Sequence, residues 1–234
     1  MKEWCFCVFI VDECRDYIPK EITEGYRGLA VANIGDARGR FGCMSWMIKP
    51  LHPDMRLCGP ALTVQTYRAD NLALHVALDM ARPGDILVVD AGAIPDTGLW
   101  GGLMNHMAQL KKLGGIIVDG GVRDSLELAG DAFPVFARAV SPQGGFKSSP
   151  GSVNVPIACG GVPVLPGDLV VGDADGVVVV PSAKAEEILK KTLAVVAKEE
   201  ELRERMDGGE TLFSLLKLDG VPERLGMLAT EKEM

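Results

Sequence analysis

Two pairs of adjacent glycines lie at positions in the sequence where a ligand or substrate could bind. Gly101-Gly102 precedes a predicted helix and follows the apolar strand predicted over 86–90. Gly120-Gly121 follows a second apolar strand, which is predicted over 116–119. Turns beyond the carboxyl ends of neighbouring parallel strands form the ligand crevice of many α/β proteins. If the two strands are neighbours in one sheet, the two glycine pairs face one pocket.

The Gly101-Gly102 pair could bind an anion through its backbone. The first N–H groups of a helix have no intrahelical partner and carry the positive end of the helix dipole. Glycine lets a carboxylate or phosphate approach these groups because it has no Cβ. The alternative is a glycine turn that only lets Trp100 and the helix pack together. The sequence favours neither interpretation.

Arg123 and Asp124 follow the second glycine pair. Arginine has a planar guanidinium group that is always charged, and aspartate has a carboxylate whose oxygens bind hard metal ions. A small substrate that carries an oxo-acid group needs both. Mg²⁺ commonly takes only one or two protein carboxylates and keeps several waters, so Asp124 could supply its ligand. Glu127 lies three residues on, on the same face of a predicted helix, where it could hold a metal-bound water. The alternative is a surface ion pair that closes the turn.

The composition excludes several classes of function. The formal net charge is −8, from 24 Lys and Arg against 32 Asp and Glu, whereas a general nucleic-acid binder needs a basic face. No segment reaches the ~18–20 apolar residues of a membrane helix. The six cysteines form no CxxC pair and no zinc-type spacing with histidine. We therefore expect a cytoplasmic protein with reduced cysteines, no membrane association and no nucleic-acid partner.

Other motifs do not match known sites. Asp90-Ala91-Gly92 follows a strand as a methyltransferase loop does, but the later cofactor glycines are missing. No GxGxxG follows any strand, which argues against a dinucleotide site. The three histidines share no common spacing, and two of them, His75 and His106, lie within helical patterns. We interpret the histidines as packing or surface residues.

The hydrophobic pattern predicts the elements that position these residues. Strands and helices alternate through two β-helix-β passages, over 56–67, 70–81, 86–90, 98–113 and 116–119. From 133 to 181 the sequence is β-rich, and a long amphipathic helix follows from 183 to 206. No composition shift marks an internal boundary. We predict one mixed α/β domain over 21–234, with residues 1–20 as an N-terminal extension.

One longer pattern resembles a known family. Residues 102–127 fit the spacing G-x20-R-D-x2-E/D, and flanking blocks agree at 36–40, 59–63, 84–90 and 175–181. This set is similar to the class II pyruvate aldolases typified by 4-hydroxy-4-methyl-2-oxoglutarate aldolase. Those enzymes share their fold with the RraA proteins, which regulate ribonuclease E activity. The resemblance runs from about residue 22 through the C-terminal helix, and residues 1–20 do not take part.

The resemblance implies a fold, a β/β/α sandwich of the swivelling-domain type, and a role for each matching residue. The implied site comprises the backbone of Gly101, Gly102, Leu103 and Met104 for the pyruvyl carboxylate, Arg123 for the keto or enolate oxygen, Asp124 for Mg²⁺ or Mn²⁺, and Glu127 for the metal waters. Family members assemble as homotrimers or dimers of trimers, with active sites at subunit boundaries. A neighbouring subunit would then contribute Asp36 or an acid of the 199–201 run.

The implied reaction passes through a pyruvate enolate. Cleavage of C3–C4 in a 4-hydroxy-2-oxo acid, or loss of CO₂ from oxaloacetate, leaves an oxyanion that a metal ion and a fixed guanidinium stabilise. Two alternatives stand beside this lyase hypothesis. One is a non-catalytic RraA-like regulator that binds a ribonuclease E-type partner, and the metal aspartate argues against it. The other is a menaquinone-pathway methyltransferase, against which the missing cofactor glycines argue.

Overall fold

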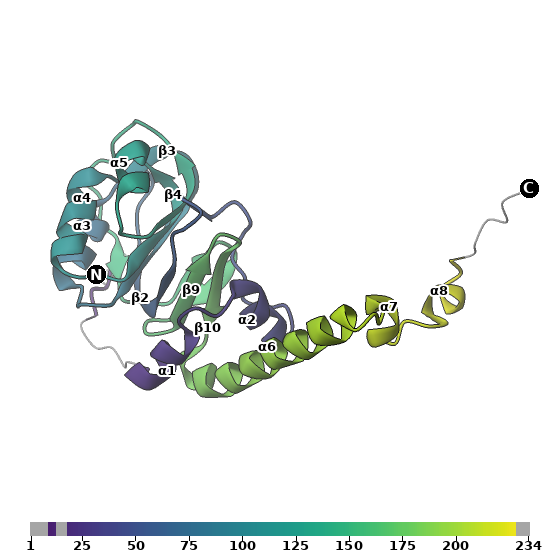
Figure 1. The fold of residues 1–234 in the computed structure, drawn as a ribbon. Coiled ribbons are helices and arrows are strands. Elements are labelled where there is room, and N and C mark those ends of the chain that lie inside the picture. The colour runs from purple at the N-terminus through teal and green to yellow at the C-terminus, as the bar shows by residue number, and fades with distance from the viewer. Residues whose placement is uncertain (1–8, 13–17, 228–234) are drawn as a thin grey trace, which may run out of the picture.

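The computed structural model describes residues 9–12 and 18–227. Four parallel apolar strands form the centre of its sheet. The strands β2 (Leu57–Gln65), β3 (Ile86–Trp100), β4 (Gly115–Val122) and β5 (Val135–Val140) pair in parallel with one another in the order β2-β3-β4-β5. Figure 1 labels the first three of them. The full order is β1-β5-β4-β3-β2-β9-β10, and β6 pairs with β2. The predicted strands around Gly101 and Gly120 are therefore neighbours.

The remaining strands come from the segment that the sequence predicts to be β-rich. They are β1 (Lys49–Pro50), β6 (Ser152–Val153), β7 (Ile157–Cys159), β8 (Val162–Val164), β9 (Leu169–Asp173) and β10 (Gly176–Val180). The strands β9 and β10 form an antiparallel hairpin, and β9 also pairs with the first half of β2. A bridge from Cys43 to Val178 and a hydrogen bond from the Met44 N–H to the Val177 carbonyl bring the segment before β1 onto β10. The sheet is thereby nearly closed into a barrel.

Helices cover this sheet in two groups. The helices α3 (Leu72–Met80), α4 (Gly102–Leu110) and α5 (Ser125–Gly130) pack on the parallel strands around the fully buried Trp100 and Leu128. The helices α1 (Lys20–Tyr26), α2 (Val31–Ala37) and α6 (Ala185–Asp207) pack on the β9–β10 hairpin instead (Figure 1). A third apolar cluster, which includes Ile86, Ile117 and Phe136, fills the interior of the barrel. The predicted mixed α/β domain is confirmed.

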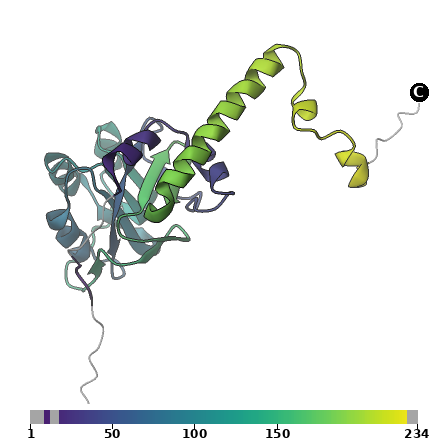
Figure 2. The ribbon, with the colours of Figure 1, turned by 90° about the horizontal axis from the view of Figure 1, so that it is seen from below.

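The long C-terminal helix packs on the domain only at its beginning. Ala185, Ile188 and Thr192 are its buried residues. Beyond them α6 extends away from the sheet, followed by the short helices α7 (Leu212–Leu215) and α8 (Val221–Arg224) (Figure 2). None of the helices in the described part of the chain is long and apolar enough to cross a membrane.

The predicted N-terminal extension falls mostly outside the described residues, which omit 1–8 and 13–17. In the described part, the Val153 N–H donates to the Ile10 carbonyl at 2.8 Å and the Asp12 N–H donates to the Val153 carbonyl at 3.2 Å. Residues 10–12 therefore lie alongside β6.

The structure corrects the end of the strand predicted over 86–90. Asp90 does not end β3, and its carboxylate accepts a hydrogen bond from the Gly92 N–H. Beyond Asp90 the pairing with β4 continues through three shifts of register, or bulges, and ends with Trp100 opposite Val122. A Cβ on Gly121 would lie 2.5 Å from the Thr97 carbonyl oxygen. Only a glycine at this position therefore lets the chain around Thr97 approach β4 closely enough to pair with it again. The interpretation of Gly120-Gly121 as a turn is therefore wrong: both residues lie within β4.

Asp119 in β4 forms a buried ion pair across the sheet. Its carboxylate accepts hydrogen bonds from Arg138 of β5 and from the backbone N–H of Gly160. The two side chains are only 12% and 8% exposed for Arg138 and Asp119. A charge at this depth is tolerated because it is fully partnered. The pair joins β4, β5 and the β7–β8 hairpin.

Candidate functional site

The ends of β3 and β4 place the two predicted segments against each other. Trp100 lies opposite Val122 in the ladder, and the Arg123 N–H donates to the Trp100 carbonyl at 2.9 Å. Gly101 and Arg123, which follow these strands, are therefore adjacent. Gly101 and Arg123 line one cavity, whereas Gly120 and Gly121 lie within β4 and do not line it, so only part of the two predicted segments faces this cavity.

Asp124 joins β4 to α5 in an unusual backbone conformation. Its φ and ψ are 57° and 37°, in the left-handed region that non-glycine residues rarely adopt. Its side chain makes no capping bond to its own helix. It turns instead to α4, where one oxygen accepts a 3.0 Å hydrogen bond from the Gly102 N–H and lies 3.5 Å from Arg123 Nε. The strained backbone is thus compensated by contacts that aim the carboxylate at α4.

Several glycines lie so close to the Arg123 and Asp124 side chains that an added Cβ would clash with them. A Cβ on Gly101 would lie 2.6 Å from an Asp124 carboxylate oxygen and 3.0 Å from Arg123 Nε. A Cβ on Gly98 would lie 2.7 Å from Arg123 Cβ, and one on Gly144 would lie 2.8 Å from Arg123 Nη1. The Arg123 side chain, which is 45% exposed, therefore has room on this side because these positions lack side chains.

Glu127 completes a group of two carboxylates above the start of α4. A Cβ on Gly102 would overlap the Glu127 carboxylate, so this group and the Asp124 carboxylate both lie over the Gly101-Gly102 backbone. The positive end of the α4 dipole favours them there. Two neighbouring carboxylates fit a hard, oxygen-binding cation such as Mg²⁺, which needs few protein ligands. In the described residues no three His, Cys, Asp or Glu side chains are grouped tightly enough to hold a metal.

The backbone at the start of α4 offers fewer donors than we expected from the sequence. The Gly102 N–H already donates to Asp124. Among the described residues no acceptor is bonded to the N–H of Leu103 or Met104, and these two groups could bind a carboxylate. Trp100, just before them, is fully buried, stacks on Phe133 and donates to Asn105 Oδ1 at 3.1 Å.

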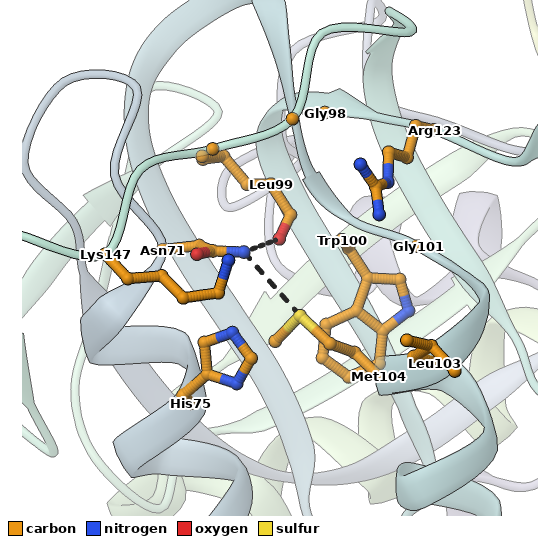
Figure 3. Close-up of a pocket in the computed structure, with 12 residues that line it drawn as sticks. Asn71, His75, Gly98, Leu99, Trp100, Gly101, Leu103, Met104, Arg123 and Lys147 are labelled. Carbon is orange, nitrogen blue, oxygen red and sulfur yellow. Dashed lines mark hydrogen bonds between the residues drawn. The ribbon is translucent and has the colours of Figure 1, made fainter.

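A cavity of about 130 Å³ opens beside this helix start (Figure 3). Arg123, Gly101, Leu103 and Met104 form one side of it, as the sequence predicts. Its other side is formed by residues that sequence reasoning did not place in a site: Asn71, His75 and Lys147. A wider hollow lies on the other side of Arg123, along Asp124, Glu127 and Val140–Pro142. Arg123 thus separates a small cavity from an open surface that carries both carboxylates.

Asn71 is the N-cap residue directly before α3, His75 lies in the first turn of that helix, and Lys147 lies in the loop between β5 and β6. Burial, together with the charge of Lys147, lowers the pKa of His75 below its ordinary value, so its imidazole is neutral at pH 7. The helical pattern around His75 led us to interpret this residue as a packing or surface residue. Its spacing from Asn71 is the signal that could have placed it in the site, because residues four apart lie on one face of a helix.

Asp36 and the acidic run at 199–201 lie elsewhere. Asp36 is in α2, which packs against β9, β10 and α6, and its carboxylate lies 3.8 Å from Arg40 Nε. Glu199, Glu200 and Glu201 are in the part of α6 that extends away from the sheet (Figure 2). None of these four acids lines either hollow next to Arg123. Their contribution to a neighbouring subunit's site stays a prediction.

Fold and site together define a class of α/β proteins in which adjacent parallel strands end in a glycine-lined Arg-Asp-x2-Glu site. The family described as RraA-like, Aldolase/RraA, matches residues 31–179 of this chain. The chain belongs to this Aldolase/RraA family, as its residues at 102–127 suggested.

Individual relatives agree with this assignment. A protein of Halalkalibacterium halodurans, provisionally named 4-hydroxy-4-methyl-2-oxoglutarate aldolase, is 39% identical over 180 residues, which are 77% of this chain and 85% of the relative. The structure of Streptomyces coelicolor RraAS2, described as an unusual member of the RNase ES inhibitor RraA family, superposes with a TM-score of 0.71. It is 31% identical and covers 80% of this chain and 98% of its own. An uncharacterized protein from Pseudomonas syringae superposes with a TM-score of 0.74 at 27% identity, covering 85% of this chain and 98% of its own.

Proposed function

We propose that this protein is a divalent-metal-dependent lyase that releases pyruvate from small oxo acids, by cleaving 4-hydroxy-2-oxo acids, by decarboxylating oxaloacetate, or both. One observation carries the proposal: Arg123, Asp124 and Glu127 converge on the glycine-lined start of α4, with a cavity alongside. The provisional name of the Halalkalibacterium halodurans relative supports the same chemistry.

Each group has a distinct task in the proposed reaction. The free N–H groups of Leu103 and Met104 bind the substrate carboxylate at the positive end of α4. The Arg123 guanidinium borders the same cavity and stabilises the negative charge that develops on the 2-oxo oxygen. The glycines beside Arg123 leave room for its side chain next to the cavity, and the Asp124 carboxylate lies 3.5 Å from its Nε.

Asp124 would hold the divalent cation, Mg²⁺ or Mn²⁺, and Glu127 would orient its waters. When bound, the cation supplies Lewis-acid stabilisation of the same oxyanion. The strained backbone of Asp124 and its bond to Gly102 keep the carboxylate aimed at this place. This proposal requires no Schiff-base lysine.

We further propose that the active unit is a homotrimer or a dimer of trimers, in which Asp36 or an acid of 199–201 reaches the site of a neighbour. Large apolar side chains beside the site support this: Leu103 is 87% exposed and Leu126 is 90% exposed. An apolar surface of this kind beside a polar site is characteristic of association.

The test measures pyruvate release from oxaloacetate and from 4-hydroxy-4-methyl-2-oxoglutarate with Mg²⁺, with EDTA, and with Asp124→Ala. We expect EDTA or Asp124→Ala to lower kcat/KM by at least ~10²-fold, since each removes charge stabilisation from the transition state. Asp54→Ala is the matched control, because its side chain is 91% exposed and lies outside both hollows. Full activity in EDTA, or in the Asp124 variant, would exclude the proposal.

A second candidate function is a regulator that binds a ribonuclease E-type partner without catalysis. The likeness to Streptomyces coelicolor RraAS2 favours this candidate. Stable capture of a ribonuclease by the purified protein, with no pyruvate release from either substrate, would establish it in place of the lyase.

A further inference from the structure

A chain of hydrogen-bonded side chains runs from the end of β3 through α4 to α5. The Trp100 Nε1–H donates to Asn105 Oδ1 at 3.1 Å, and Asn105 Nδ2 donates to Asp131 Oδ2 at 2.7 Å. Gln109, one turn further along α4, donates to the same Asp131 oxygen at 2.9 Å. These bonds connect the last residue of β3, the helix α4 and the C-cap residue of α5.

Asn105 is the buried centre of this network. Asn105 and Trp100 are both fully buried, whereas Asp131 is partly exposed. A buried amide needs partners for its donors and its acceptor, while an apolar side chain of the same size would fill the space without that requirement. The amide oxygen must face the indole N–H and the amide nitrogen must face the carboxylate. The network therefore specifies one arrangement of α4 against α5, which apolar packing alone would not do.

The short helix α5 is attached to α4 at both of its ends. At its N-terminal end the Asp124 carboxylate accepts a 3.0 Å hydrogen bond from the Gly102 N–H. At its C-terminal end Asp131 accepts the bond from Asn105. A single contact would let α5 turn about that point, whereas contacts at opposite ends fix both its position and its direction. Glu127, in the first turn of α5, is thereby held over the start of α4.

The proposed reaction depends on the separation of the same two helices. Leu103 and Met104, whose N–H groups would bind the substrate carboxylate, lie in the same turn of α4 as Asn105. The 2-oxo oxygen of the substrate would lie toward the cation that Asp124 holds. Both contacts form together only while α4 and α5 keep one separation, and a shift of about 1 Å can cost a large part of such two-point binding.

We propose that Asn105 is a positioning residue, which sets the separation between the anion-binding start of α4 and the carboxylates of α5. This inference rests on the proposed function and deepens it, because it names a residue on which two-point binding of the substrate depends. Asn105 lines neither of the two hollows next to Arg123. It therefore acts through α4 and through Asp131.

The kinetic test interrupts the network at Asn105. Asn105→Leu removes both bonds of the amide with little change in volume, and it should raise the KM for oxaloacetate ~10-fold. A variant that is only less stable would have a smaller folded fraction, which lowers the apparent kcat and leaves KM unchanged. Asp207→Asn, at the exposed end of α6 and outside the network, is the control and should leave KM unchanged.

An exchange of the two polar groups separates the network from packing. Asn105→Asp alone brings two carboxylates together, and it should raise KM at least as much as Asn105→Leu. Asn105→Asp combined with Asp131→Asn places an amide donor opposite a carboxylate again, so it should recover most of the loss in kcat/KM. Losses that simply add in the double variant would overturn the positioning role.

A binding measurement tests the same role without turnover. The EPR signal of free Mn²⁺ gives the Kd of the metal alone, and a second titration with pyruvate gives the Kd of pyruvate for the Mn²⁺-loaded protein. In Asn105→Leu the Mn²⁺ Kd should stay within threefold of the wild-type value, because Asp124 keeps its bond to Gly102. The pyruvate Kd should rise ~10-fold, because pyruvate needs both contacts. An unchanged pyruvate Kd would overturn the inference.

Hydrogen exchange in the metal-free protein shows whether α5 is loosened at one end. The Asp131 N–H donates to the Leu128 carbonyl at the C-terminal end of α5, and the Gly102 N–H bonds to Asp124 at the other end. Asn105→Leu should accelerate exchange at Asp131 at least tenfold and leave Gly102 unchanged. Unchanged exchange at Asp131 would show that Asn105 does not hold this end of α5.

The outcomes distinguish the inference from the proposed function. Faster exchange at Asp131 and weaker pyruvate binding in Asn105→Leu, without pyruvate release from oxaloacetate by the wild type, would retain the positioning role and exclude the lyase. Turnover of oxaloacetate with the wild-type KM and pyruvate affinity in Asn105→Leu would exclude the positioning role and retain the lyase.

Discussion

The Asp124 carboxylate accepts a 3.0 Å hydrogen bond from the Gly102 N–H, across a separation of 22 residues. This bond joins the end of β4 to the start of α4. It places a carboxylate over a helix N-terminus that lacks side chains at its first two positions, Gly101 and Gly102. The site therefore depends on where Cβ atoms are missing as much as on which charges are present.

Gly101→Ala should disable the site while leaving the fold intact. The added Cβ would stand 2.6 Å from an Asp124 oxygen, so the carboxylate must move. Gly101 has φ of −158°, which alanine adopts freely, and the effect is steric alone. We expect kcat/KM for oxaloacetate to fall on the order of 10²-fold with little change in Tm. Gly130→Ala is the control, because its Cβ would meet open space, and an equal loss there would refute this explanation.

Asp119→Ala should be among the most destabilising substitutions in the chain. It leaves Arg138 charged and buried and removes the acceptor of the Gly160 N–H. The expected loss in the free energy of unfolding is about 3–5 kcal/mol, measured by urea denaturation. Replacing both partners with apolar residues, Asp119→Leu with Arg138→Met, should recover most of it. A double variant that is less stable than Asp119→Ala would contradict the explanation that the unpaired, buried Arg138 charge causes the loss.

Acidification should destabilise the protein partly through His75. Burial and the Lys147 charge lower the pKa of His75 in the folded state, so below about pH 6.5 the unfolded chain binds this proton more readily than the native protein. The contribution is present above pH 6.5, and it decreases as the pH falls until the folded group also titrates. His75→Gln removes this titration, so its Tm should fall less than that of the wild type between pH 8 and pH 5. Parallel Tm curves would contradict the prediction.

Asp70→Asn should loosen the loop that carries Lys147. An asparagine has one uncharged acceptor oxygen, so either the Ser148 and Ser149 N–H groups or the Leu72 N–H would face an amide nitrogen, and the remaining bonds would lose the carboxylate charge. Although burial raises the pKa of Asp70, these bonds and that from Leu72 outweigh it and lower the pKa overall. We expect a loss of roughly 1–3 kcal/mol and faster hydrogen exchange at Ser148 and Ser149. Asp54→Asn should change neither the stability nor the exchange. Unchanged exchange in Asp70→Asn would show that the Asp70 carboxylate is not needed to hold this loop.

Local sequence patterns were sufficient to predict the helices and strands near the site, except for the ends of β3 and β4. The apolar run 86–90 and the glycines after 113 and 119 predicted adjacent strands and the helices between them. The continuation of β3 from Asp90 to Trp100 was not predictable, because its residues alternate irregularly and pair with β4 only through a bulge. That pairing depends on Gly120 and Gly121 in another strand, which no local pattern around Asp90 contains.

The sequence by itself determined the Aldolase/RraA resemblance, the mixed α/β class and the group Arg123, Asp124 and Glu127. Their types and spacing are local properties, since a strand, a short turn and one helical turn bring them together. Only the tertiary structure decided that Gly102 uses its N–H on Asp124, and that Asn71, His75 and Lys147 share the Arg123 cavity. These relationships join segments that lie 22 or more positions apart, so the packing of β3, β4, α3 and the loop between β5 and β6 creates them.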